Sequence, residues 1–115
     1  MSYVDPFGGQ PASPSFVGFR AVSLAANVVL YWPWANQNTT DLAAKIMEVT
    51  PTSGGFTMTL PSALQAGTGE AILFINVGAS SFTVLDAAGG AVVTVAPSIG
   101  YYVFLTDNST LAGSW

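Results

Sequence analysis

The side chains of this 115-residue chain that could do acid–base or metal chemistry are six carboxylates and two cations. The carboxylates are scattered along the sequence, as Asp5, Asp41, Glu48, Glu70, Asp86 and Asp107. No two lie within a few residues of each other, as the oxygen-rich loop of a calcium site requires. Glu48 and Glu70 could still meet in space as the carboxylate pair of a glycosidase. Asp86 and Asp107 fall at predicted turns, where capping the turn is the usual role of an aspartate.

Nucleophilic catalysis is not supported by the remaining residue types. The chain has no histidine and no cysteine, and its only cations are Arg20 and Lys45. A serine hydroxyl needs an adjacent base to become a nucleophile, and a cysteine-free chain has neither disulfides nor thiolate metal sites. The sequence therefore predicts a non-enzymatic protein without metal or cofactor, which works by shape and contact.

An aromatic cluster is the one local concentration of binding-type side chains. Trp32 and Trp34 flank Pro33, and Tyr31 lies beside them. Such rings could stack against a sugar, or they could cover a core or an interface, since strand alternation aims Trp32 and Trp34 to the same side. We favour the core or interface, and carbohydrate binding stays as an alternative.

The composition indicates that other subunits cover part of the apolar surface of this chain. Half of the residues are hydrophobic, only 7% are charged, and the net charge is −4. Clustered Lys and Arg are absent, which argues against nucleic acid. The longest apolar stretch, 22–34, is interrupted by polar residues and proline and is too short for a membrane helix, so no membrane partner is expected. We expect a permanent homo-oligomer, the alternative being a weakly charged monomer.

Hydrophobic alternation and turn residues predict a strand-rich domain over residues 16–115. Segment 42–49 fits both a helical stripe and a strand, and we favour a strand from residue 44. Segment 71–77 is apolar on both faces, the pattern of a strand between two layers. No exact internal repeat appears. The expected fold is all-β, a single antiparallel β-sandwich or jelly-roll-like domain with strands near 19–24, 27–32, 44–49, 56–60, 71–77, 82–85, 91–95 and 101–106.

Residues 1–15 form a separate segment, an extended N-terminal arm that prolines and glycines keep from forming a helix or a ladder. The arm is either a disordered terminus or a strap that docks on a neighbour. The strap is favoured because large apolar side chains would be exposed in a solvated tail. The candidate assembly contacts in and beside this arm, together with the two tryptophans, are Tyr3, Val4, Phe7, Phe16, Trp32 and Trp34.

The stretch 56–115 carries a recurring order of turns and strands. It reads Leu60-Pro61-Ser62-Ala63, then Gly69 through Asn76-Val77-Gly78, then Phe82-Thr83-Val84-Leu85-Asp86 with Gly89, and finally Gly113-Ser114-Trp115. This order resembles a module of structural proteins of tailed bacteriophages, particularly tail fibres and appendages. Ser62 stands where that family usually has a charged residue. The resemblance covers about half of the chain and consists of turn and strand residues, not of catalytic ones.

The resemblance implies a virion structural protein, the N-terminal attachment domain of a tail fibre or appendage, localised to the virion. Phage fibres are commonly trimers, so it implies a homotrimer whose partners are other virion proteins, namely an adaptor, portal or capsid protein. It also implies that the chain is the N-terminal part of a longer fibre protein. A capsid decoration or cement protein is the alternative, and a carbohydrate-binding module using Trp32 and Trp34 is a further one.

Overall fold

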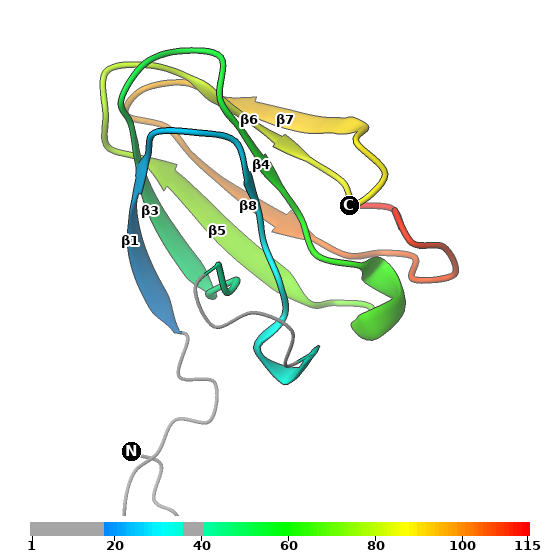
Figure 1. Cartoon of the computed structure of the whole chain (residues 1–115). Helices are drawn as coiled ribbons and strands as arrows, with labels where there is room; N and C mark the ends of the chain where they lie inside the picture. The colour runs from blue at the N-terminus through cyan, green and yellow to red at the C-terminus, as the bar shows by residue number, and fades with distance from the viewer. Residues whose placement is uncertain (1–17, 36–40) are drawn as a thin grey trace, which may run out of the picture.

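The computed structural model describes residues 18–35 and 41–115, which form two four-stranded sheets that face each other (Figure 1). Sheet A has the order β1 (Phe19–Leu24), β3 (Ile46–Pro51), β5 (Ala71–Asn76), β8 (Gly100–Phe104). Sheet B has the order β2 (Val28–Val29), β4 (Thr57–Thr59), β6 (Phe82–Leu85), β7 (Ala91–Val95). Among the described residues the helical elements are two 3-10 turns, η1 (Pro33–Ala35) and η2 (Ala63–Gln65).

The prediction of a single antiparallel β-sandwich or jelly-roll-like domain is wrong, because both sheets are mixed. In sheet A, β1 pairs parallel with β3 and β3 pairs parallel with β5, while β8 is antiparallel to β5. Sheet B repeats the arrangement with β2, β4 and β6 parallel and β7 antiparallel to β6. Alternation along a strand reports which side chains are buried, but it does not report the direction of the neighbouring strand.

The parallel pairs arise because the chain crosses to the opposite sheet after each of its first strands. It passes from sheet A to sheet B and back until β6, so each parallel connection includes a strand of the other sheet in place of a helix. In sheet A the paired residues Phe19, Ile46 and Leu73 recur every 27 positions (19, 46, 73). The three residue types differ, so this structural recurrence left no repeat visible in the sequence.

Several local predictions are confirmed. The ambiguous segment 42–49 contains a strand and not a helix, although β3 runs from Ile46 to Pro51. β6 and β7 form the predicted antiparallel hairpin, with Gly89 at a φ of 94° in its turn. The predicted strand 27–32 is shorter than expected, because only Val28–Val29 is a strand and η1 begins at Pro33.

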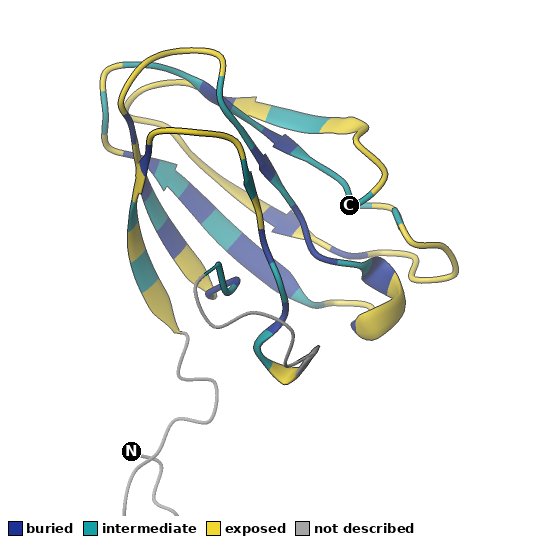
Figure 2. Ribbon diagram, in the orientation of Figure 1, coloured by how far each residue is buried: buried dark blue, intermediate teal, exposed yellow. Residues whose placement is uncertain are grey.

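The hydrophobic core lies between the two sheets. Figure 2 shows buried and more exposed residues alternating along β3 and β5, as expected for strands with one face toward a core. Phe74 of β5 and Phe82 of β6 meet edge to face across this core, with ring centroids 6.3 Å apart. Their contact joins sheet A to sheet B.

Among the described residues, the polar side chain that is fully buried is Asn76, at the end of β5. Its Nδ2 donates to the carbonyls of Ser80 (2.7 Å) and Val95 (3.0 Å), and its Oδ1 accepts from the N–H of Gly78 (2.9 Å). Gly78 has no room for a side chain, because a Cβ there would lie 2.9 Å from the Cδ of Pro51. The Asn-x-Gly pair therefore ties the β5–β6 loop to the end of β7.

Substituting Asn76→Ala should lower the free energy of unfolding by about 2–4 kcal/mol, because it leaves buried backbone groups without hydrogen-bond partners. Chemical denaturation measures this loss. Asn108→Ala is the matched control, since the Asn108 side chain donates a single bond to the Ala66 carbonyl (2.8 Å) from an exposed position. Equal losses at the two positions would contradict the structural role given to Asn76.

Candidate functional site

The aromatic cluster is a stack of tryptophan rings beside η1. Trp32 and Trp34 lie nearly parallel, with ring centroids 4.8 Å apart and planes 8° from each other. The prediction that both rings lie on one side is confirmed, although a 3-10 turn starting at Pro33 positions them, not a strand. Trp32 is 2% exposed and belongs to the core, whereas Trp34 is 53% exposed. The stack therefore leads from the core to the surface.

Both stacked indoles are fixed by hydrogen bonds to the turn η2. The Nε1–H of Trp32 donates to the carbonyl of Ser62, and that of Trp34 donates to the carbonyl of Gln65, each at 2.8 Å. The hydroxyl of Ser62 accepts from the N–H of Leu64 and so caps η2 (3.2 Å). A buried indole N–H needs such a partner, so η2 determines how the rings are held.

Trp115 forms the third member of this cluster. Its ring lies 6.3 Å from that of Trp32 at 27°, and its Nε1–H donates to the Ala112 carbonyl (3.1 Å). Gly113 directs the chain toward this position with a φ of 68°, in close contact with Ala63 of η2. Sequence reasoning noted Trp115 only as part of a Gly-x-Trp pattern and did not place it with Trp32.

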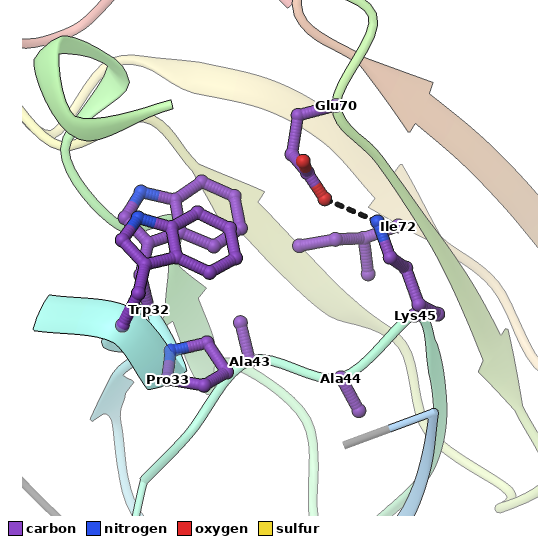
Figure 3. A pocket seen from close by; sticks show the side chains of 8 residues that line it. Trp32, Pro33, Ala43, Ala44, Lys45, Glu70 and Ile72 are labelled. Atoms are coloured by element: carbon purple, nitrogen blue, oxygen red, sulfur yellow. Dashed lines mark hydrogen bonds and ion pairs between the residues drawn. The ribbon is translucent and has the colours of Figure 1, made fainter. Parts of the chain in front are cut away.

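A small cavity lies next to the stack (Figure 3). Ala43, Ala44 and Ile72 line it together with the tryptophans, and the ion pair between Lys45 and Glu70 lies across from the rings. Its volume is about 20 Å³, which is the space of a water molecule and not of a sugar ring. The half-exposed ion pair contributes at most about 1 kcal/mol to stability.

Glu48 and Glu70 do not come together as the carboxylate pair of a glycosidase. Glu48 pairs in register with Ile75, and Glu70 lies five residues before that position, roughly 16 Å along the strand. A glycosidase pair needs about 5–10 Å, so the two glutamates do not act together. No group of three or more metal-ligating side chains occurs in the described part of the chain.

Two other aspartates have the turn-capping role that the sequence predicted. The Oδ1 of Asp86 accepts from the N–H groups of Ala88 (2.9 Å) and Gly90 (2.8 Å) in the β6–β7 turn. Hydrogen bonds from the backbone and the hydroxyl of Ser109 hold the pKa of Asp107 below its usual value. Both aspartates stabilise local turns.

The second candidate site is the outer face of sheet A, away from the core. We call it the apolar face and define it by its six large side chains, which are Phe19, Ile46, Leu73, Ile75, Tyr102 and Phe104. Four of the six are exposed by more than a third of their surface. Sequence reasoning inferred exposed apolar surface from composition but did not locate it.

The structure brings together only two of the six predicted assembly contacts, Trp32 and Trp34. Tyr3, Val4, Phe7 and Phe16 lie outside the described residues. The role of all six in assembly stays a prediction.

No helix in the described part of the chain is both long and apolar enough to cross a membrane. Comparison of the chain with protein-family models, with curated proteins and with solved structures found no match.

Proposed function

We propose that the chain is a non-enzymatic structural protein of a bacteriophage virion, the N-terminal attachment domain of a tail fibre or similar appendage. In this proposal the domain is a homotrimer. The residues 1–15 then contact an adaptor, portal or capsid protein.

The observation that carries the proposal is the place of the phage-like turn residues in the fold. Ser62 and Ala63 of the Leu-Pro-x-Ala turn contact Trp32 and Gly113, and Gly113 opens the closing Gly-x-Trp. Asn76 and Gly78 of the Asn-x-Gly pair hold the opposite end of β5. These residues make contacts that hold the fold together, and their order along the chain is the pattern from which the proposal is drawn.

Electron microscopy with gold-labelled antibodies against the purified chain tests this proposal on particles from the source of the sequence. Label at the tail or at one appendage site is the expected result. Label spread in hundreds of copies over the capsid would support a decoration protein instead. Particles without label, in a lysate that contains the chain, would contradict a virion role.

Deleting residues 1–15 should leave the fold intact but should stop incorporation of the protein into particles. The reason is that the first described strand, β1, begins at Phe19, so the deletion removes none of the described strands, while it removes Tyr3, Val4 and Phe7. Thermal unfolding checks the fold, and immunoblotting of purified particles checks incorporation. Normal incorporation of the shortened protein would contradict the proposed role of the arm.

The exposed ring of Trp34 favours a carbohydrate-binding module as the second candidate. The cavity that Trp34 lines holds only about 20 Å³, so a sugar that stacks on Trp34 would lie across the exposed ring and not inside this cavity. Calorimetric titration of the chain with cellohexaose and chitohexaose tests this candidate. Binding that disappears in Trp34→Ala would support it, and the absence of heat with the unmodified chain would contradict it for these sugars.

A further inference from the structure

The apolar face forms a continuous row across the whole of sheet A. The register places Phe19 beside Ile46, Ile46 beside Leu73, and Leu73 beside Tyr102. Phe19 is 54% exposed, and Tyr102 is 66% exposed. Because the row extends from one edge strand to the other, the exposed apolar residues form one patch and not isolated side chains.

The outer face of sheet B provides an internal comparison. Its corresponding row is Thr57, Thr83 and Thr94, and the hydroxyls of Thr83 and Thr94 lie 3.2 Å apart. The next outward row of this face, Val29, Thr59, Leu85 and Ala91, is partly apolar, and Val29 is 49% exposed. The two faces belong to sheets of the same topology, but only the row on sheet A is apolar throughout and carries aromatic rings, those of Phe19 and Tyr102.

The strand direction gives a second reason to expect a cover. Sheets with parallel strands are normally covered on both faces, and β1, β3 and β5 are parallel. β5 reads as a strand between two layers, yet its outward side chains Leu73 and Ile75 remain partly exposed. The inner layer is supplied by sheet B, and the described residues supply no outer layer.

The charge and the area of the apolar face match a second copy of this chain. Glu48 is the only charged side chain on the outward side of sheet A, since Arg20 is half-buried and donates to the Leu42 carbonyl. A charged partner would find almost nothing to pair with on this face. A second copy presents an equally uncharged surface.

The exposed parts of the three aromatic rings, Phe19, Tyr102 and Phe104, come to roughly 350 Å², taking about 200 Å² for a whole aromatic side chain. The three aliphatic side chains of the apolar face add to this area. A standard interface buries about 800 Å² per partner, of which roughly 450–500 Å² is apolar. The apolar face is therefore large enough to form the centre of a stable interface.

We infer that the apolar face is the self-association surface of this chain, and that the same face of the other copies covers it, so that in the proposed trimer the three faces meet around the symmetry axis. The inference rests on the homo-oligomer in the proposed function and identifies the surface that forms it. Glu48 lies inside this surface, between Ala21 and Ile75 in the register. Burying its carboxylate opposes association, so the charge limits the affinity.

Sedimentation velocity over a dilution series of the full chain tests the inference with three variants. Tyr102→Asp should raise the dissociation constant at least about tenfold, because it places a charge at the centre of an apolar contact. Leu64→Asp is the matched control, since Leu64 is an exposed apolar residue on η2, outside the apolar face, and should change the constant less than about twofold. Glu48→Gln should tighten association.

Circular dichroism must show that each variant is folded, and Phe104→Asp replaces Tyr102→Asp if the latter does not fold. A monomeric chain at micromolar concentration would overturn the inference. Equal effects of Tyr102→Asp and Leu64→Asp, or weaker association of Glu48→Gln, would overturn it as well. If the oligomer dissociates only when residues 1–15 are removed, these residues and not the apolar face make the contact, and the inference is overturned. These outcomes are independent of particle labelling, so failure of the inference and failure of the virion role are distinguishable.

Discussion

Trp32→Ala should lower the free energy of unfolding by about 3–5 kcal/mol, the range for removing a large buried aromatic side chain. Trp32 is nearly fully buried, and it stacks on both Trp34 and Trp115. Its removal also leaves the Ser62 carbonyl without the indole N–H that it accepts. Domains of this size have about 5–15 kcal/mol of stability, so this one change could remove a large part of it.

Chemical denaturation of the purified variant measures the effect, and Trp34→Ala is the matched control. Trp34 shares the stack and has an equivalent hydrogen bond to Gln65, but half of its ring faces solvent. We expect a loss of about 1 kcal/mol for the control. If Trp34→Ala lowers the free energy of unfolding as much as Trp32→Ala does, the two rings do not differ in burial as described.

Gly113→Ala should destabilise the protein by about 3 kcal/mol or more, through two separate causes. A residue with a side chain is strained at the φ of 68° that Gly113 adopts. The added Cβ would also lie 2.4 Å from the Cβ of Ala63 and 2.8 Å from the carbonyl oxygen of Asp107. The second contact is with backbone, so the neighbours cannot move away without disturbing the turn that places Trp115.

Gly55→Ala separates these two causes. Gly55 has a φ of 91°, and a Cβ built there meets no atom within 4 Å. It should therefore show only the backbone strain, about 1 kcal/mol. Thermal unfolding of the two variants, with near-ultraviolet circular dichroism to follow the tryptophans, measures the difference. If both variants lose the same stability, the close contact between Gly113 and Ala63 is not part of the folded structure.

The sequence predicted the strands better than their arrangement. Alternation at Phe56, Met58 and Leu60 and the glycines after Asp86 are local signals, and the structure has β4 and the β6–β7 hairpin there. Strand direction depends on where the chain goes after each strand. The segments after β1 and β3 cross to the other sheet, and this crossing has no signature in hydrophobic alternation.

The tryptophan stack was predicted in part for the same reason. Trp32 and Trp34 are close in the sequence, so alternation was enough to expect them on one side. Their partners come from far along the chain, with Ser62 30 positions and Gln65 31 positions away. The Leu-Pro-x-Ala and Gly-x-Trp patterns were the only signals that could have indicated Ser62 and Trp115.

The apolar face shows how composition and structure complement each other. The low charge of the chain predicted that one chain by itself exposes apolar surface, which partners cover. Composition does not say where on the fold this surface lies. Strand register then placed Phe19 and Tyr102, which are far apart in the sequence, in one row on one face. Segment 71–77 had already indicated a strand with two covered faces, and the structure supplies a cover for one of them.

The central claim is that this chain functions by assembling with copies of itself, and its native mass tests that claim most directly. Light scattering coupled to size exclusion at micromolar concentration gives the mass of the purified chain independently of its shape. The account predicts an oligomer, with three times the chain mass of 11.8 kDa for the proposed trimer. A stable species of 11.8 kDa at all concentrations would contradict the account.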